Sequence, residues 1–260
     1  MTASPVASSG PDLPPPGGLC AIHQPNLFPR LSTLAKLFAA DYWIVLDDVQ
    51  FSRRDYQHRA RLAAWDQPLR RQWLTIPTHL PSGRATTICD AVVADPLRSR
   101  RRLEQMPRQH YRSSPHWSAL GQVLERLGDL FATTDRTAEI AEASTRLMLD
   151  LLGWRGGVLR SSSLAAGPGR SQRLADLAEI TGARGYLCGT GGSTYLDTGC
   201  FAARHIAVVP FRTPSIGSWE AAREISAVCP LMRLGPRTLA AEMSSVAVAH
   251  RRSELSQNSI

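Results

Sequence analysis

The chain has 260 residues, 43% of them hydrophobic, and carries a net charge of +8 with a pI of about 9.8. This composition excludes a disordered or fibrous protein, and the length allows a substantial buried core. No apolar run reaches the roughly 18 to 20 residues of a membrane span. The strongly basic surface favours polyanionic or acidic partners.

The cysteines and the first residues bear on the compartment. The five cysteines lack CxxC spacing, and no close His/Cys pair is typical of a structural zinc site, so we expect reduced thiols, no metal and no cofactor. Residues 1–18 contain no Lys or Arg and no apolar stretch, which argues against a secretory signal and favours a disordered leader. We expect a cytoplasmic protein with one α/β domain over 19–245 and a polar tail over 246–260.

Short apolar runs alternate with helical periodicity along the chain. Extended segments are expected at 19–23, 42–46, 73–77, 91–94, 158–161, 185–188 and 205–211. Helices are expected at 30–40, across 96–153, at 171–183 and at 219–232. This order predicts an α/β fold with a mostly parallel sheet, flanking helices and a helical insertion or layer around 96–153.

Polar clusters follow three of the expected strands. They are His23-Gln24-Pro25-Asn26, Asp47-Asp48-Val49-Gln50, and the segment from Cys188 through Gly189, Gly191 and Gly192. Ligands in open α/β sheets bind outside the carboxyl ends of the strands. We therefore expect the three clusters to converge on one face, where Cys188, His23 and one of the two aspartates would form a catalytic set.

Cys188 is the candidate nucleophile, because the glycines after it let a substrate and backbone N–H groups approach closely. A buried, inert cysteine is the competing interpretation. The same glycines could instead cradle a phosphate, but GTGGS lacks the lysine and spacing of a P-loop. His23 would be the general base, and Asp47 or Asp48 would orient it or bind an incoming amine.

Arginine clusters carry much of the positive charge, since Lys36 is the single lysine. Arg53, Arg54, Arg59 and Arg61 follow the aspartate cluster closely, so we expect them at the mouth of the site, where they would dock an acidic partner. Solvated surface charge in an arginine-rich composition is the alternative. Nucleic-acid binding is disfavoured, because no helix-turn-helix, zinc-finger or RNP signature accompanies the charge.

These clusters also carry a family resemblance. Segment 21–62, with His-Gln-Pro-Asn, Asp-Asp-Val-Gln and a basic stretch, resembles the signature of WbqC-like proteins, as do WLTIP at 73–77 and the glycine-rich 185–197. The resemblance covers residues 20 to 235. It departs from the expected pattern at His58, where Asn is usual, and at Cys188, where we expect Ser.

The resemblance implies transfer of an aminoacyl or other acyl group from an activated donor to an amine, such as that of an amino sugar. A cysteine in place of serine would suit a thioester donor on an acidic carrier protein. A role similar to that of the amide-condensing enzymes of lincosamide antibiotics would fit. Three alternatives are condensation without a covalent intermediate, a non-catalytic sugar- or carrier-binding partner, and hydrolysis of an acyl-enzyme by water. Expected substrate-binding residues are Gln24, Asn26, Gln50, Gly189, Gly191, Gly192 and Tyr195.

Overall fold

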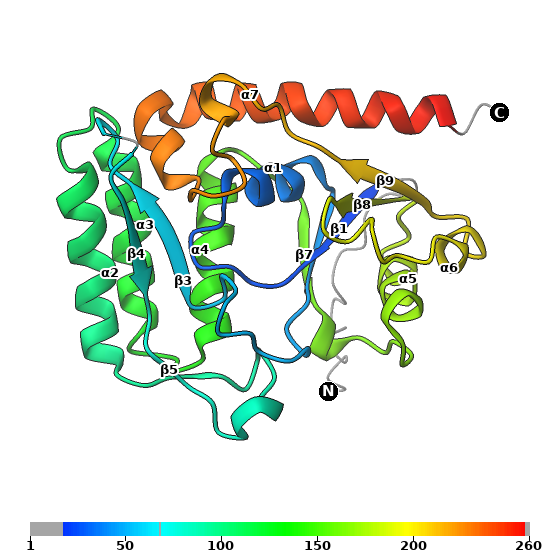
Figure 1. Ribbon diagram of the computed structural model, residues 1–260, viewed down its shortest axis with the longest axis horizontal. Coiled ribbons are helices and arrows are strands. Elements are labelled where there is room, and N and C mark those ends of the chain that lie inside the picture. The colour runs from blue at the N-terminus through cyan, green and yellow to red at the C-terminus, as the bar shows by residue number, and fades with distance from the viewer. Residues whose placement is uncertain (1–17, 68, 258–260) are drawn as a thin grey trace, which may run out of the picture.

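A computed structural model of the protein describes residues 18–67 and 69–257 (Figure 1). The expected leader lies outside these residues except for Gly18. Five parallel strands form the central sheet in the order β7-β2-β1-β8-β9. They are β1 (Leu19–His23), β2 (Tyr42–Val45), β7 (Gly157–Arg160), β8 (Gly185–Gly189) and β9 (Ala207–Phe211). The α/β fold with a parallel sheet predicted from the sequence is confirmed.

Helices cover both faces of this sheet, because side chains alternate along the buried strands. In β1, Leu19 and Ala21 belong to the core shared with α1 (Leu31–Ala39) and α7 (Val228–Gln257). Figure 1 shows these two helices on the same side of the sheet. Cys20 and Ile22 point the other way, into a smaller core under α5 (Arg170–Ile180) and α6 (Gly199–Ala202). A residue's place in the strand therefore decides which helical layer it meets.

The strand order reverses at the centre of the sheet. From β1 the chain adds β2 and then β7 on one side, and then adds β8 and β9 on the other. A crevice opens at such a reversal, outside the carboxyl ends of the two strands that flank it. Here these strands are β1 and β8, so the fold places a binding crevice directly after His23 and Gly189.

The predicted helical layer is present as α2 (Pro96–Tyr111), α3 (Trp117–Leu130) and α4 (Thr137–Leu151). Helix α2 begins at the expected residue 96. Asp95 caps its N-terminus by accepting a hydrogen bond from the Arg98 N–H, and a proline in the first turn favours a helix start. Figure 1 shows the three helices stacked beside the sheet. No helix in the described part of the chain is long and apolar enough to cross a membrane.

Segment 59–63, for which no strand or helix was expected, is a strand. β3 (Arg59–Ala63) pairs antiparallel with β4 (Arg71–Thr75), and the short β5 (Thr78–His79) pairs with β6 (Val92–Val93). Alternation in Arg-Ala-Arg-Leu-Ala was the available signal, with Ala60 and Leu62 buried. Three short 3-10 turns complete the fold: η1 (Gly83–Ala85), η2 (Ser161–Ser163) and η3 (Gly217–Trp219).

The C-terminal region differs from expectation at both ends. The helix expected from 219 begins only at Val228, and α7 then runs to Gln257 with a kink at Gly235, whose φ is +78°. Val246 is buried, and the His250 ring stacks on Phe211 with centroids 4.3 Å apart. The expected domain boundary at 245 therefore falls inside α7, because this helix packs on the sheet.

Candidate active site

A pocket of about 410 Å³ opens at the carboxyl ends of β1 and β8. Its wall combines the end of β1, the first half of α1, the glycine-rich loop after β8 and the segment around 213–223. Its charged or titratable side chains near neutral pH are those of His23, Arg30, Lys36 and Arg223, and none of its lining residues is an aspartate or glutamate. The fold thus concentrates cations in the crevice at the strand reversal.

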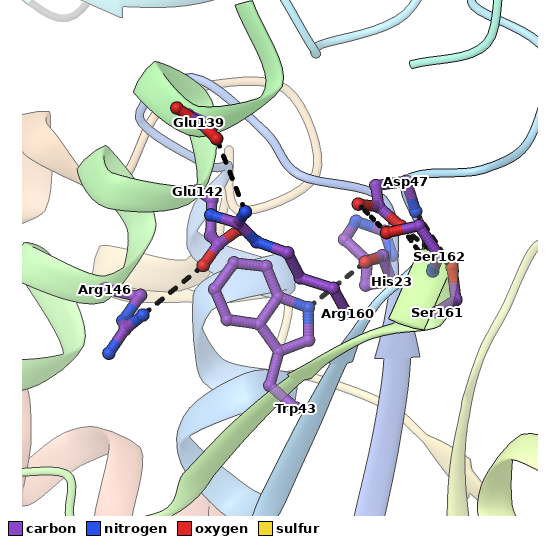
Figure 2. A network of polar contacts seen from close by, with 9 residues as sticks. All are labelled: His23, Trp43, Asp47, Glu139, Glu142, Arg146, Arg160, Ser161 and Ser162. Carbon is purple, nitrogen blue, oxygen red and sulfur yellow. Dashed lines mark hydrogen bonds and ion pairs between the residues drawn. The ribbon is translucent and has the colours of Figure 1, made fainter. Parts of the chain in front are cut away.

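His23 is held from three sides at the end of β1. Its Nε2 lies 3.2 Å from Oδ1 of Asn26, and its Nδ1 lies 3.5 Å from Nζ of Lys36. Its backbone oxygen accepts a hydrogen bond from Nε1 of Trp43 at 3.1 Å (Figure 2). Since a lysine ammonium only donates, these partners fit a neutral ring with its proton on Nε2. Burial, followed by the charges of Lys36 and Arg30, holds the His23 pKa well below 6.5.

Asn26 fixes the loop that follows His23. Its side-chain amide donates to the backbone oxygen of Pro25 at 3.1 Å, and its own backbone oxygen accepts from the hydroxyls of Thr145 and Ser144 at 2.9 and 3.2 Å. Both hydroxyls belong to α4, far away in the sequence. Asn26 is 3% exposed, so this expected substrate-binding residue positions His23 instead of facing a ligand.

Lys36 is a buried pocket residue that the sequence analysis did not single out as a site residue. It projects from α1 with 6% of its surface exposed, and its Nζ donates to the backbone oxygen of Ile22 at 3.3 Å besides contacting His23. Burial lowers its pKa to about 8; Cys188 and Cys20 oppose this shift, and the charge of Arg30 adds to it. No ion pair to Lys36 is formed within the described chain. The available signal was a single lysine within the otherwise apolar residues 34–39 of α1.

Cys188 does not meet His23, contrary to our expectation. It faces the α5 side with 1% of its surface exposed, whereas His23 continues the series of Leu19 and Ala21 toward α1. Its Sγ donates to the backbone oxygen of Gly189 at 3.5 Å, and burial raises its pKa. The reason is strand alternation, which places the two side chains on opposite faces of the sheet.

Gly192 closes the space above this thiol. A Cβ added at Gly192 would lie 3.1 Å from Sγ of Cys188, so a side chain there would crowd the sulfur. The N–H groups of Gly192 and Ser193 both bind the backbone oxygen of Gly189, at 2.9 and 3.2 Å. These two amides, which were expected to approach a substrate, therefore shape the loop itself.

Asp47 and Asp48 do not orient His23 either. Asp47 accepts hydrogen bonds from Ser161 Oγ at 3.1 Å and from the N–H and Oγ of Ser162 at 3.0 and 2.8 Å (Figure 2). Asp48 accepts from Ser161 Oγ at 2.6 Å and pairs with Arg173. Because both lie past the end of β2, strand alternation no longer separates them, and both turn toward the end of neighbouring β7.

Ion pairs also link the end of β7 to α4. Arg160 Nε lies 2.7 Å from Glu142, and Arg160 NH1 lies 3.4 Å from Glu139; Arg146 contacts Glu142 from the other side at 3.4 Å (Figure 2). The Glu142 side chain is only 6% exposed, so two cations compensate its buried charge. This network joins β7 to α4 and is structural.

A second pocket, of about 400 Å³, lies on the other side of the glycine-rich loop. It shares Gly191 and Gly192 with the first pocket and contains the expected residues Gln24, Gln50 and Tyr195. Gln24 accepts from Gln57 at 2.6 Å, and Tyr195 is 71% exposed. The wall also contains Leu46, Val49, Leu174 and Leu196, so it is more apolar than that of the first pocket.

The expected docking arginines lie on or before β3. Arg59 stacks on Trp73 with its Cζ 4.4 Å from the ring centre, and Arg61 lies 3.8 Å from Glu224. Arg53 and Arg54 are exposed in the turn before this strand.

No group of three His, Cys, Asp or Glu side chains within 18–67 and 69–251 is placed to hold a metal ion.

Comparison with known proteins identifies the family. Residues 24–224 match the WbqC-like protein family. The chain belongs to this family. The WbqC-like match runs from the loop after β1 to the segment that contains Arg223, so it includes most of both pockets.

One relative of this WbqC-like chain carries no assigned function. It is "Uncharacterized protein Rv1507c" of Mycobacterium tuberculosis (strain ATCC 25618 / H37Rv), 24% identical over 196 residues, which cover 74% of this chain and 80% of that protein. No solved structure matches the chain.

His58, where the chain departs from the expected family pattern, is buried beside Phe51 with ring centroids 5.3 Å apart.

Proposed function

We propose that this WbqC-like protein is a cytoplasmic acyltransferase that forms an amide between an activated acyl group and an amine. The reaction takes place in the pocket beside His23 and Lys36. One observation carries the proposal: a neutral imidazole and a lysine with a pKa of about 8 contact each other in a pocket without carboxylates. A base whose pKa lies near the working pH is the group that general base catalysis needs.

Lys36, rather than His23, is the better base in this arrangement. The pKa of His23 is held far below neutrality, which makes its ring a poor proton acceptor. Lys36 exists partly as the free amine near pH 8, and Nδ1 of His23 holds its Nζ in place. As the substrate amine attacks a thioester carbonyl, a C–N bond forms and the C–S bond breaks. Lys36 takes the proton from the amine and returns it to the departing thiolate.

Direct attack on the donor suits this site better than an acyl-enzyme. Cys188 is covered by Gly192, and its raised pKa disfavours the nucleophilic thiolate. Two pockets that meet at Gly191 and Gly192 offer room for two substrates at once. Alignment of two bound reactants can contribute roughly 7 to 11 kcal/mol without any covalent intermediate.

The donor in this proposal is an acyl or aminoacyl thioester on an acidic carrier protein, and the acceptor is an amino sugar. Arg53 and Arg54 are exposed and have no ion pair within the described residues, so they are available to an acidic surface. Encounters steered by such charges weaken as salt is added.

A product assay tests the proposal. The purified protein is incubated with carrier-bound acyl thioesters and a set of amino sugars, and amide product is measured by mass spectrometry. We expect product with wild type and with Cys188→Ser, and a large loss with Lys36→Met. Arg233→Gln is the control, because Arg233 lines a separate pocket whose wall contains glutamates.

Each other outcome has a definite meaning. Binding of donor or acceptor without turnover across the whole set would identify a non-catalytic partner and reject the transferase. A stable acyl adduct on Cys188 in the intact protein would restore the covalent route. Product formed by Lys36→Met at the wild-type rate would remove Lys36 as the base.

A further inference from the structure

Two arginines stand at the rim of the His23–Lys36 pocket without a counter-charge. Arg30 precedes α1, its Cζ lies 4.3 Å over the Tyr56 ring, and its NH1 donates to the backbone oxygen of Arg223 at 3.0 Å. The Nε of Arg30 is buried and has no hydrogen-bond partner within the described chain. A buried donor without an acceptor is costly, so this guanidinium is placed for a group that the protein itself does not supply.

Three other partly buried arginines each have an acidic partner. Arg173 pairs with Asp48, Arg160 with Glu142, and Arg204 with Asp176. Within residues 18–67 and 69–251, neither Arg30 nor Arg223 forms an ion pair. The charge of Arg30 also lowers the pKa of both His23 and Lys36, which shows that its field reaches into the pocket.

The backbone holds the two arginines together. The N–H of Leu31 donates to the oxygen of Ile225 at 3.2 Å, and the N–H of Ser32 donates to the oxygen of Ala222 at 2.9 Å. The segment that carries Arg223 is thereby fastened to the start of α1. The positive end of this helix dipole adds to the two charges, and its first turn contains no acidic residue.

Hydroxyl donors complete the wall. Ser32 and Thr33 line the pocket from the first turn of α1, and Thr190 and Thr213 line it from the facing segments. Two cations with several hydroxyls match an anion that has several acceptor oxygens and about two negative charges. A single carboxylate would leave one cation uncompensated.

We propose that Arg30 and Arg223 bind a phosphate group of one substrate of the pocket, in a diphosphate or a phosphodiester. This inference rests on the proposed function, because it names a chemical class for a substrate of that same site. The phosphate lies among Arg30, Arg223 and the start of α1, and leaves Lys36 free to act on the amine. The Gly192 and Ser193 amides of the glycine-rich loop do not hold the phosphate, since they bind the backbone oxygen of Gly189.

Two substrate sources share this chemistry. A sugar linked to a nucleoside diphosphate carries a diphosphate and would enter as the acceptor. The prosthetic arm of a carrier protein carries a phosphodiester with one charge and would enter as the donor. Two cations favour the more highly charged group, so the acceptor is the substrate that we expect to carry the phosphate.

Binding of inorganic pyrophosphate to the whole chain provides the test. Calorimetry at low salt compares wild type with Arg30→Gln, Arg223→Gln and the control Arg233→Gln. We expect each pocket variant to weaken pyrophosphate binding by about tenfold or more, the usual effect of losing a charge-assisted hydrogen bond. The control should bind like wild type. Arg223 is exposed, so its variant keeps the test valid if Arg30→Gln fails to fold.

Lys36 supplies an independent readout, because it is the only lysine in the sequence. An amine-reactive reagent labels it, and peptide mapping separates it from any terminal amine. Bound pyrophosphate should slow the labelling of Lys36 near pH 8, since the anion offsets the charge of Arg30 and favours the ammonium. Labelling in Arg30→Gln should not respond to pyrophosphate.

Further ligands distinguish the sources. Uridine 5′-diphosphate binding more tightly than pantetheine 4′-phosphate supports a nucleotide-linked acceptor, and the reverse order assigns the phosphate to the donor arm. Acetate that binds as tightly as pyrophosphate, or affinity equal in all variants, overturns the proposal. Amide formation with no pyrophosphate binding would reject the phosphate subsite alone; pyrophosphate binding with no amide from any substrate pair would reject the transferase alone.

Discussion

Two polar clusters lie at the same edge of the same sheet, and their electrostatics are opposite. At the end of β2 and β7, Asp47 and Asp48 are surrounded by Ser161, Ser162 and Arg173, so their charges are satisfied within the protein. At the end of β1 and β8, Lys36 and its neighbouring arginines face a pocket that contains no carboxylate. From the sequence, the polar residues after β1 and those after β2 were both candidates, whereas Lys36 and its neighbouring arginines were not.

The contrast teaches that a polar cluster at a strand end is a necessary but insufficient sign of a site. Groups that already have all their partners stabilise the fold, whereas groups buried without partners make the fold less stable and are available to a ligand. The two clusters should therefore respond in opposite ways to substitution. Loss of charge should weaken activity but not stability at the first pocket, and stability but not activity at the β2–β7 edge.

The largest expected effect is on turnover. Lys36→Met should lower kcat/KM for amide formation by roughly 100- to 10,000-fold, because the base is removed while a side chain of similar volume remains. Product formation under conditions of low substrate concentration measures the effect. A loss smaller than about threefold would place Lys36 outside the chemistry.

The same substitution should increase stability, with a defined pH dependence. The pKa of Lys36 is about 8 in the folded chain and 10.5 as its ordinary value, so between these values the unfolded state binds more protons. Wild-type stability therefore rises from pH 8 to 10.5, and the burial penalty is fully present below pH 8. Lys36→Met should raise the free energy of unfolding by about 3 kcal/mol at pH 7, and this gain should shrink toward pH 10.5. Urea unfolding across this range checks the sign; equal gains at both ends would contradict the lowered pKa.

The opposite response is expected at Asp47. Asp47→Ala leaves Ser162 without its acceptor and should lower the free energy of unfolding by about 2 kcal/mol. Pyrophosphate affinity should stay within about twofold of wild type. Asp66→Ala, at an exposed position, is the matched control for loss of one negative charge. If Asp47→Ala abolishes catalysis in a protein that stays folded, the β2–β7 edge belongs to the active site.

The smallest effect is expected at Cys188. Because its thiol is buried with a raised pKa, Cys188→Ala should change kcat/KM by less than about threefold. Iodoacetamide should modify Cys200 and Cys89, which are partly exposed, before Cys188 in the folded protein. Rapid alkylation of Cys188 that stops turnover would show that the covering loop opens and that the thiol takes part.

The sequence by itself determined the class of fold and most of its elements. Strand β1 is found at the expected residues 19–23, the layer of α2, α3 and α4 occupies 96–151, and the glycine-rich loop follows β8. These features depend on local periodicity, on helix caps such as Asp95 and on apolar runs. All three signals lie between residues that are close in the sequence. The hairpin of β3 and β4 had a similar local signal, because buried and arginine residues alternate in β3. The arginines made this segment look like a basic surface stretch instead of a strand.

The tertiary structure alone decided which polar groups meet. Ser161 reaches Asp47 across 114 positions of sequence because β7 pairs with β2, and this pairing occupies the carboxylates that were expected to orient His23. Cys188 and His23 end adjacent strands but face different helical layers. Lys36 reaches His23 because α1 packs over β1 and turns one cation inward. Such contacts depend on strand order and on the face that each side chain occupies, and no local pattern specifies either.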